Sequence, residues 1–381
     1  MDRNMKKWHS YKLSDVVRFN PSERLLKGEI AKKVPMDLLQ PYTRGISGFE
    51  MASYTGGSKF RNGDTLMARI TPCLENGKTA YVSMLDEDEV GFGSTEYIVF
   101  RNIEGITDNK FVYYFVTSPW FRDIAVKSMV GSSGRQRVQQ AMLENLVVNL
   151  PPLAEQKQIA GILGALDDKI ELNRCINDNL EEQAKARFKS WFVDSDRNEW
   201  VHYELGDITL ITAGGDRPSK YTNKKTIECY VPIYSNGIDN EGLYGYTDVA
   251  KIHEESITIS ARGTIGYVCL RLEPYVPIVR LISIIPNKKE LSAKYLYLWA
   301  LTQNITGTGT TQQQLTVPIF RKTPISIPSD TKLKQFNSIA DPLFSQIESN
   351  KKENIKLSTL RDTLLPKLMS GELSVEEVSL D

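Results

Sequence analysis

The sequence predicts a mixed α/β (α+β) chain in which two globular domains are each followed by a long helix. Three observations predict this architecture: an internal repeat, short β-rich runs between turn signals, and two long segments with apolar residues three or four positions apart. The 381 residues are enough for two domains with proper cores. The content of 41% hydrophobic and 25% charged residues is ordinary for a globular protein.

The internal repeat has a very long period. The segment WHSYKLSDV, which starts at Trp8, returns as WVHYELGDI from Trp200, with Trp, Tyr, Leu and Asp at one constant offset. An Ala-Arg pair at 68–69 recurs at 261–262 with nearly the same offset. Each half then continues with a Gly-rich polar loop, a short apolar segment that ends in proline, and a long helical pattern. We therefore expect one module, duplicated.

The globular parts are expected to combine strands and helices. The runs 96–100, 257–260 and 281–285 are β-rich and stand between turn signals, which is typical of strands. Helical patches interrupt such runs at 110–117 and 293–301. The expected organisation is a first globular domain, a first helical region, a second globular domain and a second helical region, at 1–150, 151–195, 196–328 and 329–381.

The two helical regions carry a narrow apolar seam. Along 153–193 and 331–369 apolar residues follow one another in steps of three and four, as in a coiled coil. Each region has an Asn-rich middle. A helix of about 40 residues is roughly 60 Å long at 1.5 Å per residue. The residues expected to pair the helices are Ile159, Leu163, Leu166, Ile170, Leu180, Ile339, Leu343, Ile347, Leu360 and Leu364.

Duplication within one chain should give the helix pair an approximate two-fold axis. An antiparallel pair would place the two modules at opposite ends of a rod, facing opposite ways. That arrangement suits duplex DNA, because dimeric readers space their half-sites about one helical turn, roughly 34 Å, apart. The 47 basic and 47 acidic residues give no net charge, so any DNA-binding surface must be local.

Two segments carry a resemblance to a known family. The first is LPPLAEQKQIA at 150–160, which continues into LDDKIELN at 166–173, and the second is LRDTLLPKLMSGEL at 360–373. With two modules, each followed by a helical region, the chain resembles the specificity subunit of type I restriction–modification enzymes over essentially its whole length. The second copy of the Pro-Pro-Leu-Ala-Glu-Gln turn departs from the first and reads PSDTKLKQF from Pro328.

The resemblance implies a non-catalytic subunit of a complex that methylates and cleaves double-stranded DNA. Each module, as a target recognition domain, would read one half of a bipartite site, and the helices would set the unread spacer. Two modification (methyltransferase) subunits would dock on the chain, and restriction (translocase/nuclease) subunits would join them. S-adenosylmethionine for adenine methylation, and ATP and Mg for restriction, would be bound by these partners and not by this chain.

DNA contacts are expected from polar loops, since cationic groups hold phosphates while Arg, Gln and Asn read base edges. Arg69 and Arg262 occupy matching repeat positions, which also suits a structural pairing. Trp8 and Trp200 are expected to pack at the module starts. The expected DNA-binding residues are Arg44, Lys59, Arg61, Arg69, Arg135, Gln136, Arg137, Arg217, Lys220, Tyr221, Asn236, Arg262, Thr310, Thr311 and Gln312.

Two other classes of protein remain as alternatives: a self-sufficient DNA-modifying enzyme and a coiled-coil scaffold that does not bind DNA. The stretch NLPPL at 149–153 is similar to the Asn-Pro-Pro-aromatic loop of DNA amino-methyltransferases, but Leu150 separates Asn from the prolines and Leu153 replaces the aromatic residue. We interpret it as a strand end, a rigid turn and a helix start. The run 167–169, DDK, is interpreted as a solvated helix face rather than a nuclease motif.

No motif points to a metal, an ATPase site or a membrane, and no catalytic residue is expected. The four cysteines lie far apart and the three histidines form no closely spaced pair, which a zinc site would need. No Walker A sequence occurs. The N-terminal segment has no apolar core for a signal peptide, and no stretch approaches the roughly 18–20 apolar residues that cross a bilayer. The expected location is the cytoplasm.

Overall fold

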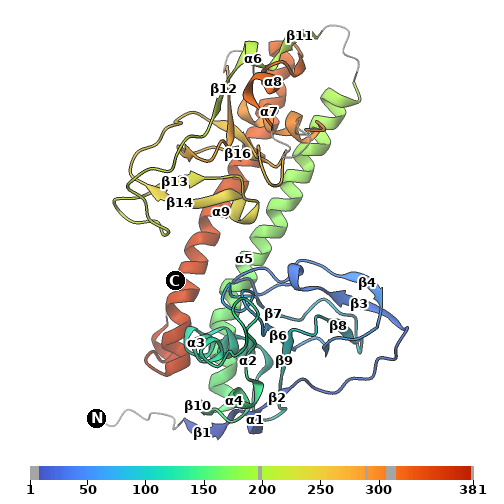
Figure 1. Ribbon diagram of the computed structural model, residues 1–381, viewed down its shortest axis with the longest axis vertical. Helices are drawn as coiled ribbons and strands as arrows, with labels where there is room; N and C mark the ends of the chain where they lie inside the picture. The colour runs from blue at the N-terminus through green and yellow to red at the C-terminus, as the bar shows by residue number, and fades with distance from the viewer. Residues whose placement is uncertain (1–7, 196–199, 288–290, 306–314, 379–381) are drawn as a thin grey trace. The chain divides into compact units, whose positions relative to one another are not determined.

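The computed structural model describes residues 8–195, 200–287, 291–305 and 315–378. The chain divides into two compact units, one formed by Met1–Arg174 with Lys351–Asp381 and the other by Cys175–Asn350. Two long helices, α5 (Leu153–Phe188) and α9 (Asp330–Ser370), each contribute one part to each unit. They are the green and red helices in Figure 1.

The first unit is built on two four-stranded sheets, with strand orders β2-β9-β6-β7 and β4-β3-β8-β5, and on a short ladder of β1 with β10. Strand β3 pairs with β8 in parallel and with β4 in antiparallel orientation. The strands are β1 (His9–Lys12), β2 (Val17–Phe19), β3 (Ile30–Val34), β4 (Glu50–Ser53), β5 (Lys59–Phe60), β6 (Thr65–Ala68), β7 (Thr79–Tyr81), β8 (Gly91–Gly93), β9 (Tyr97–Asn102) and β10 (Val147–Leu150).

Two capped helices build the main core of this unit. Helix α2 (Asn109–Thr117) begins where the Asp108 carboxylate accepts a hydrogen bond from the N–H of Phe111 at 2.9 Å, and α3 (Pro119–Lys127) begins at a proline behind the cap Ser118. Six consecutive α2 residues are buried in one core with residues of α5 and α9. The short helices α1 (Leu13–Val16) and α4 (Gln140–Glu144) complete this unit.

The second unit repeats the order of the first unit's β2-β9-β6-β7 sheet and its short ladder, while its other sheet has three strands in place of four. Its four-stranded sheet has the order β12-β18-β15-β16, β13 pairs in parallel with β17 and antiparallel with β14, and a short ladder joins β11 to β19. The strands are β11 (Val201–Glu204), β12 (Thr209–Ala213), β13 (Val231–Tyr234), β14 (Leu243–Thr247), β15 (Ser256–Ile259), β16 (Val268–Arg271), β17 (Val276–Pro277), β18 (Ile282–Pro286) and β19 (Pro324–Ile327). This shared order confirms the duplication predicted from the sequence.

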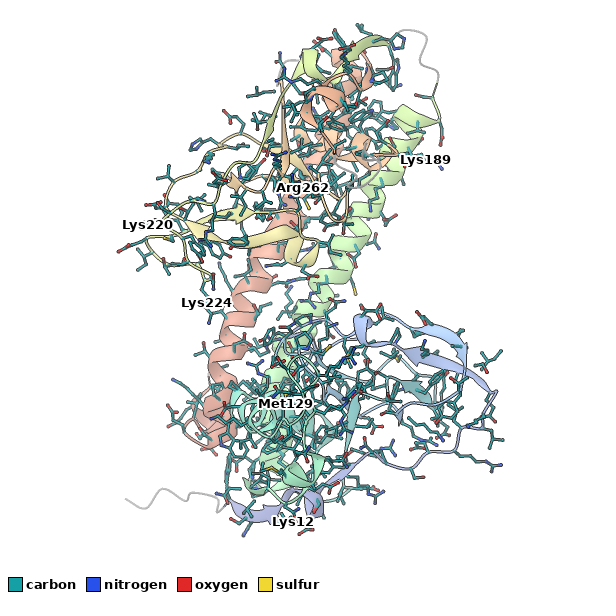
Figure 2. The ribbon with its side chains drawn as sticks, in the orientation of Figure 1. Lys12, Met129, Lys189, Lys220, Lys224 and Arg262 are labelled. Carbon is teal, nitrogen blue, oxygen red and sulfur yellow. The ribbon has the colours of Figure 1, made fainter. Side chains whose placement is uncertain are left out.

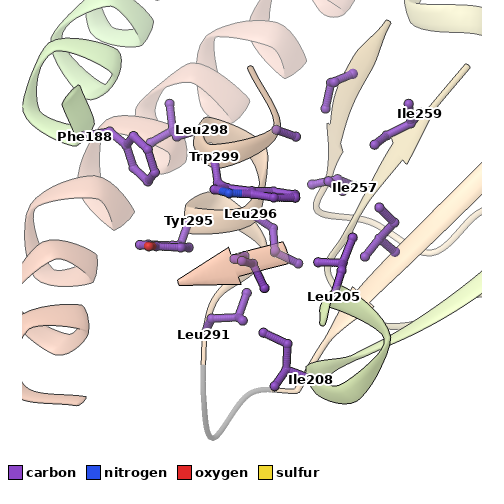
Figure 3. Close-up of a cluster of buried hydrophobic side chains, with 14 of the residues drawn as sticks. Phe188, Leu205, Ile208, Ile257, Ile259, Leu291, Tyr295, Leu296, Leu298 and Trp299 are labelled. Carbon is purple, nitrogen blue, oxygen red and sulfur yellow. The ribbon is translucent and has the colours of Figure 1, made fainter. Parts of the chain in front are cut away.

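An aromatic core closes the second unit. Figure 3 shows Tyr295 and Trp299 of α7 (Ala293–Leu301) near Phe188 of α5 and Ile257 of β15. The rings of Phe188 and Tyr295 lie 5.1 Å apart, edge to face. The other helices of this unit are α6 (Leu205–Ile208), α8 (Val317–Arg321) and a π-helical turn after α5 (Lys189–Val193).

The strand-to-helix junction interpreted from NLPPL is confirmed, since β10 ends at Leu150 and α5 begins at Leu153. The buried Gln156 amide joins this junction to the loop before α2, because it donates to the carbonyls of Pro151 at 2.9 Å and Ile106 at 3.1 Å. In the second unit β19 ends at Ile327 and α9 begins at Asp330. The position equivalent to Gln156 holds Leu333, which is buried in the apolar core. At the second junction an apolar contact of Leu333 therefore replaces the hydrogen bonds that Gln156 makes at the first.

The predicted module-start packing holds for both tryptophans. Trp8 donates its Nε1–H to Glu155 at 3.3 Å, and Trp200 packs against the core of the second unit. Among the described helices, none combines the length and apolar character that crossing a membrane requires.

Candidate DNA interface and helix pair

Within the first unit, α5 and α9 pack along an apolar seam. All four α5 residues expected here are buried: Ile159, Leu163, Leu166 and Ile170. From α9, Leu365 and Leu368 lie in the same core as the first two of them, and Leu364 packs partly buried against it. The expectation for Leu360 was wrong. It is 42% exposed because the neighbouring Arg361 takes the inward position and pairs with α5.

Within the second unit, the seam is more aromatic than the sequence suggested. Ile347 is buried as expected, whereas Leu180, Ile339 and Leu343 are only partly buried. The deeper contacts come from Ala340 and Phe344, one position later along α9. The steps of three and four were therefore right, but the side of the helix that faces inward was displaced by one residue.

Buried asparagines interrupt the seam in both units, and they were noted in the sequence only as a compositional feature. In the first unit, Asn173 Nδ2 donates to Asn354 Oδ1 at 2.9 Å and to Glu353 Oε2 at 2.8 Å. In the second unit, Asn350 Nδ2 donates to Asn177 Oδ1 at 2.8 Å. Asn173 and Asn350 are 1% and 5% exposed.

The two asparagine pairs correspond to each other position by position. Asn173 and Asn177 of α5 are equivalent to Asn350 and Asn354 of α9. Each pair joins the first of these asparagines on one helix to the second on the other helix. The secondary bonds correspond too, since Asn354 Nδ2 donates to the carbonyl of Ile170 at 3.4 Å and Asn177 Nδ2 to that of Ile347 at 3.5 Å. Polar residues buried in a helix seam fix its alignment at a cost in stability. Rising numbers on α5 meet falling numbers on α9, so the pairing within each unit is antiparallel.

Arg44, which was expected to bind DNA, lies against α5 instead. Its side chain is buried, and its guanidinium donates to both carboxylate oxygens of Glu171, at 3.0 and 2.6 Å, and to Asp168. Burial alone would lower the pKa of Arg44, but the hydrogen bonds that it donates to Glu171 and Asp168 keep this pKa above its ordinary value. Arg44 therefore joins the globular part of its unit to the helix, and we leave it out of the candidate interface.

A second buried ion pair joins α5 to α9 in the first unit. Arg361 Nη1 lies 2.6 Å from Asp167 Oδ1, and the hydroxyl of Tyr114 donates to Asp167 Oδ2 at 2.7 Å. Burial, followed by the Asp167 charge, raises the pKa of Tyr114 above its ordinary value. The interpretation of 167–169 as a solvated face was therefore wrong for Asp167, which is 2% exposed.

The basic candidates of the first module on β5 and directly after it contact Glu23. Arg61 Nε and Arg101 Nη1 lie 2.7 and 2.6 Å from its carboxylate, and Lys59 Nζ donates to its backbone carbonyl at 2.8 Å. Burial would raise the pKa of Glu23, but the hydrogen bonds from Arg61 and Arg101 lower this pKa below its ordinary value. Arg101, which was missed in the sequence, is the arginine that also binds Asp64, at 2.6 Å.

The Gly-rich loop of the first module presents its cations differently. Arg137 forms a two-pronged ion pair with Glu96, with Nη2 at 2.6 Å, and this hydrogen bond lowers the pKa of Glu96. Arg69 is half-buried and donates to the carbonyl of Val138 at 3.4 Å. Arg135 is exposed and Gln136 is half-exposed on the same loop. Of these four side chains, Arg135 is thus exposed with no ion pair to a described carboxylate.

In the second module, the expected run at 216–225 carries an oriented arginine. Arg217 is exposed, and its guanidinium carbon lies 3.9 Å from the ring centroid of Tyr221. Lys220 lies 3.3 Å from both Glu228 and Asp248. Figure 2 labels Lys220 and Lys224 on the loop beside β13 and β14.

Two further candidates of the second module differ in exposure. Both ends of the Asn236 amide are used within the protein, because it donates to the carbonyl of Val279 at 2.7 Å and accepts from the N–H of Ala261 at 2.8 Å. Asn236 therefore has a structural duty. Arg262 is exposed. Thr310, Thr311 and Gln312 lie outside the described residues. Across the part of the chain that the structure describes, no group of three or more His, Cys, Asp or Glu could hold a metal ion.

Comparison with known proteins identifies the family. The model described as "Type I restriction modification DNA specificity domain" matches residues 5–182 and 197–359. The type I restriction enzyme MjaIX specificity subunit of Methanocaldococcus jannaschii is 28% identical over 320 residues, which cover 73% of each chain. The type I restriction enzyme HindI specificity subunit of Haemophilus influenzae is 26% identical over 408 residues, covering 82% of this chain and 87% of the relative.

A solved structure shares the fold. The crystal structure of the type I restriction-modification system S subunit from M. genitalium matches with a TM-score of 0.57 at 18% sequence identity, covering 96% of this chain and 97% of the other. The repeated modules and the two matches to one DNA specificity domain define the class as a specificity subunit, not an enzyme with its own active site. The chain belongs to the family of type I restriction–modification specificity subunits, as the sequence predicted.

Proposed function

We propose that this chain selects the DNA sequence on which a type I restriction–modification complex acts. Residues 1–150 and 196–328 would be the two target recognition domains, each reading one half of a bipartite duplex site, and residues 151–195 and 329–381 the helical regions between them. The observation that best supports this proposal is the strand order β2-β9-β6-β7, which the second unit repeats as β12-β18-β15-β16, with the same two helices contributing to each unit. A duplicated reader suits a target with two separated halves.

The proposed interface consists of polar side chains on the loops of the two modules. In the first module these are Arg135 and Gln136, and in the second Arg217 with its neighbours Lys220 and Tyr221. An arginine engaged with a carboxylate, as Arg137 is with Glu96, is compatible with this role, because a phosphate can take the place of the carboxylate on the arginine fork. The candidates Lys59, Arg61, Arg69, Arg262, Thr310, Thr311 and Gln312 remain in the proposal as the sequence analysis gave them.

The helices supply the second part of the proposed function. Their outer faces would dock two modification subunits, and restriction subunits would join the same assembly. S-adenosylmethionine, ATP and Mg would bind to those partners, as the resemblance to the family implies. An assembly that acts on genomic DNA would work in the cytoplasm.

Methylome sequencing of a host that carries the chain with its modification subunit tests the proposal. We expect methylated adenines within one bipartite motif that has a fixed unread spacer, and no such methylation when this chain is deleted. The purified chain alone should transfer no methyl group. A motif without a spacer, or methyl transfer by the chain alone, would contradict the proposed function.

A further inference from the structure

One arginine of the second module is held in place by two tyrosine rings. The Arg217 guanidinium carbon lies 3.9 Å from the centroid of Tyr221 and 6.0 Å from that of Tyr244, and Arg217 Nη1 donates to the Tyr244 hydroxyl at 3.1 Å. Arg217 is nevertheless exposed. A guanidinium stacked in this way loses little rotamer freedom when it binds a ligand, and its Nε–H and Nη2–H groups stay available as a planar pair of donors.

Arg217 also differs from five arginines of the chain whose charges are paired with carboxylates. Arg44, Arg61, Arg101, Arg137 and Arg361 each contact a carboxylate at ion-pair distance. For Arg217, no carboxylate lies within that distance among the residues that the structure describes. Arg217 therefore combines an exposed, un-neutralised charge with a restrained orientation, which is a suitable state for an incoming acceptor.

A strained turn anchors the loop that carries Arg217. Val279 and Arg280 have φ angles of 52° and 61°, a conformation that is rare for side chains other than glycine and unusual for a β-branched valine. The N–H groups of these two residues donate to the carbonyls of Gly215 and Gly214, both at 2.9 Å. The Asn236 amide holds the Val279 carbonyl from the other side.

The start of the Arg217 loop, at 214–215, is therefore bonded to the turn at 279–280, and Asn236 bonds this turn in its own position. Close approach of the backbones is required, because a Cβ on Gly214 would lie 2.7 Å from the Ile278 nitrogen. Strain of this kind persists where the surrounding structure enforces it, and it gathers at functional sites. The side chain of Arg280 is exposed, and its backbone N–H is the group that donates to Gly214 of this loop.

We propose that Arg217 is a base-reading residue of the second recognition module and that it takes guanine through O6 and N7 in the major groove. This proposal rests on the proposed function. Guanine is the base whose major-groove edge offers two adjacent acceptors, and a planar pair of arginine N–H donors matches them. Lys220 and Lys224 on the same loop supply point charges suited to phosphate, which carries no sequence information (Figure 2).

The first test compares methylomes of hosts that carry the modification subunit with either the native chain, Arg217→Ala or Lys224→Ala. We expect the native motif to contain guanine in one half. Arg217→Ala should accept other bases at that one guanine and leave the opposite half and the spacer unchanged. Lys224→Ala, the phosphate-class control, should lower methylation at all sites without changing the motif.

Each other result is decisive. A half-site without guanine, or an Arg217→Ala motif identical to the native one, would overturn the role of Arg217 while leaving the proposed function intact. A native methylome without any bipartite motif would overturn the proposed function itself. Arg217→Lys guards against a folding defect, since it retains the charge and should weaken discrimination at the same single position.

A binding cycle separates base contact from phosphate contact. Duplexes that carry 7-deazaguanine at the half-site guanine lack the N7 acceptor, and the native complex of chain and modification subunit should bind them about 5- to 100-fold more weakly than the normal duplex. The Arg217→Ala complex should bind both duplexes equally. If 7-deazaguanine weakened the binding of both complexes equally, Arg217 would not contact N7, and the proposal would be overturned. The proposal would also be overturned if the native complex bound both duplexes equally and Arg217→Ala only made the salt dependence shallower, because Arg217 would then contact a phosphate.

Discussion

At the scale of single residues, the asparagines of the helix seam connect composition to alignment. A buried asparagine side chain costs stability unless its groups are bonded, so Asn173 and Asn350 favour the one register in which Asn354 and Asn177 face them. An all-leucine seam would stabilise several registers about equally. The polar pairs therefore favour a single alignment in each unit.

Replacing one member of an asparagine pair should cost more than replacing both. Asn350→Leu leaves Oδ1 of the half-buried Asn177 without its hydrogen-bond donor and should lower the free energy of unfolding by about 1–3 kcal/mol. The double variant Asn177→Leu/Asn350→Leu should recover most of this loss. Urea denaturation measures both, and additive losses in the double variant would show that the asparagines are not coupled.

The buried pair of Arg361 with Asp167 should behave in the same way but more strongly. Arg361→Ala leaves Asp167 as an uncompensated buried charge and should destabilise the chain by about 3–5 kcal/mol. By the correspondence that relates the two asparagine pairs, Arg361 is equivalent to Ala184 and Asp167 to Phe344. Both of these residues pack in the apolar core of the second unit. Arg361→Ala/Asp167→Phe copies that solution and should restore stability. A double variant as unstable as Arg361→Ala would contradict this account.

At the scale of elements, the sequence predicted periodic features better than chosen partners. Both long helices, the strands near 97–102, 256–259 and 282–286, and the NLPPL junction follow from local pattern and proline geometry. The side of α9 that faces inward could not be predicted in this way. Arg361 and Asn354 lie on that side, and a pattern of hydrophobic residues does not include polar ones. Arg44 and Asn236 were misplaced for a related reason. Their partners, Glu171 and Val279, are distant in sequence, so burial could not be read from the neighbouring residues.

The paired helices give an element-scale prediction about the spacer. Inserting one helical turn after Asn173, matched by one after Asn350, preserves both asparagine pairs and lengthens the helices between them by about 6 Å. The unread spacer should lengthen by about one to two base pairs, with both half-sites retained. An insertion in only one helix misaligns the pair and is the matched control, for which methylation should fall. An unchanged spacer in the double insertion would remove the role of the helices as a ruler.

At the scale of the whole molecule, one module has been used twice with different attachments to its helices. The first module is joined by the charged contacts of Arg44 and Arg361 and by the Gln156 amide, whereas the second relies on an aromatic and aliphatic core. The strand order β2-β9-β6-β7 of the first unit is nonetheless repeated as β12-β18-β15-β16 in the second. Two readers on one frame can therefore diverge in sequence independently, which is what recognition of two unrelated half-sites requires.

Module exchange followed by methylome sequencing tests this account most directly. Residues 1–150 would be replaced by the matching part of a related specificity subunit with a known target, and the hybrid expressed with the modification subunit of this chain. The account predicts a motif in which one half is new while the other half and the spacer are unchanged. A motif altered in both halves, or altered in neither, would contradict the claim that each module reads its own half.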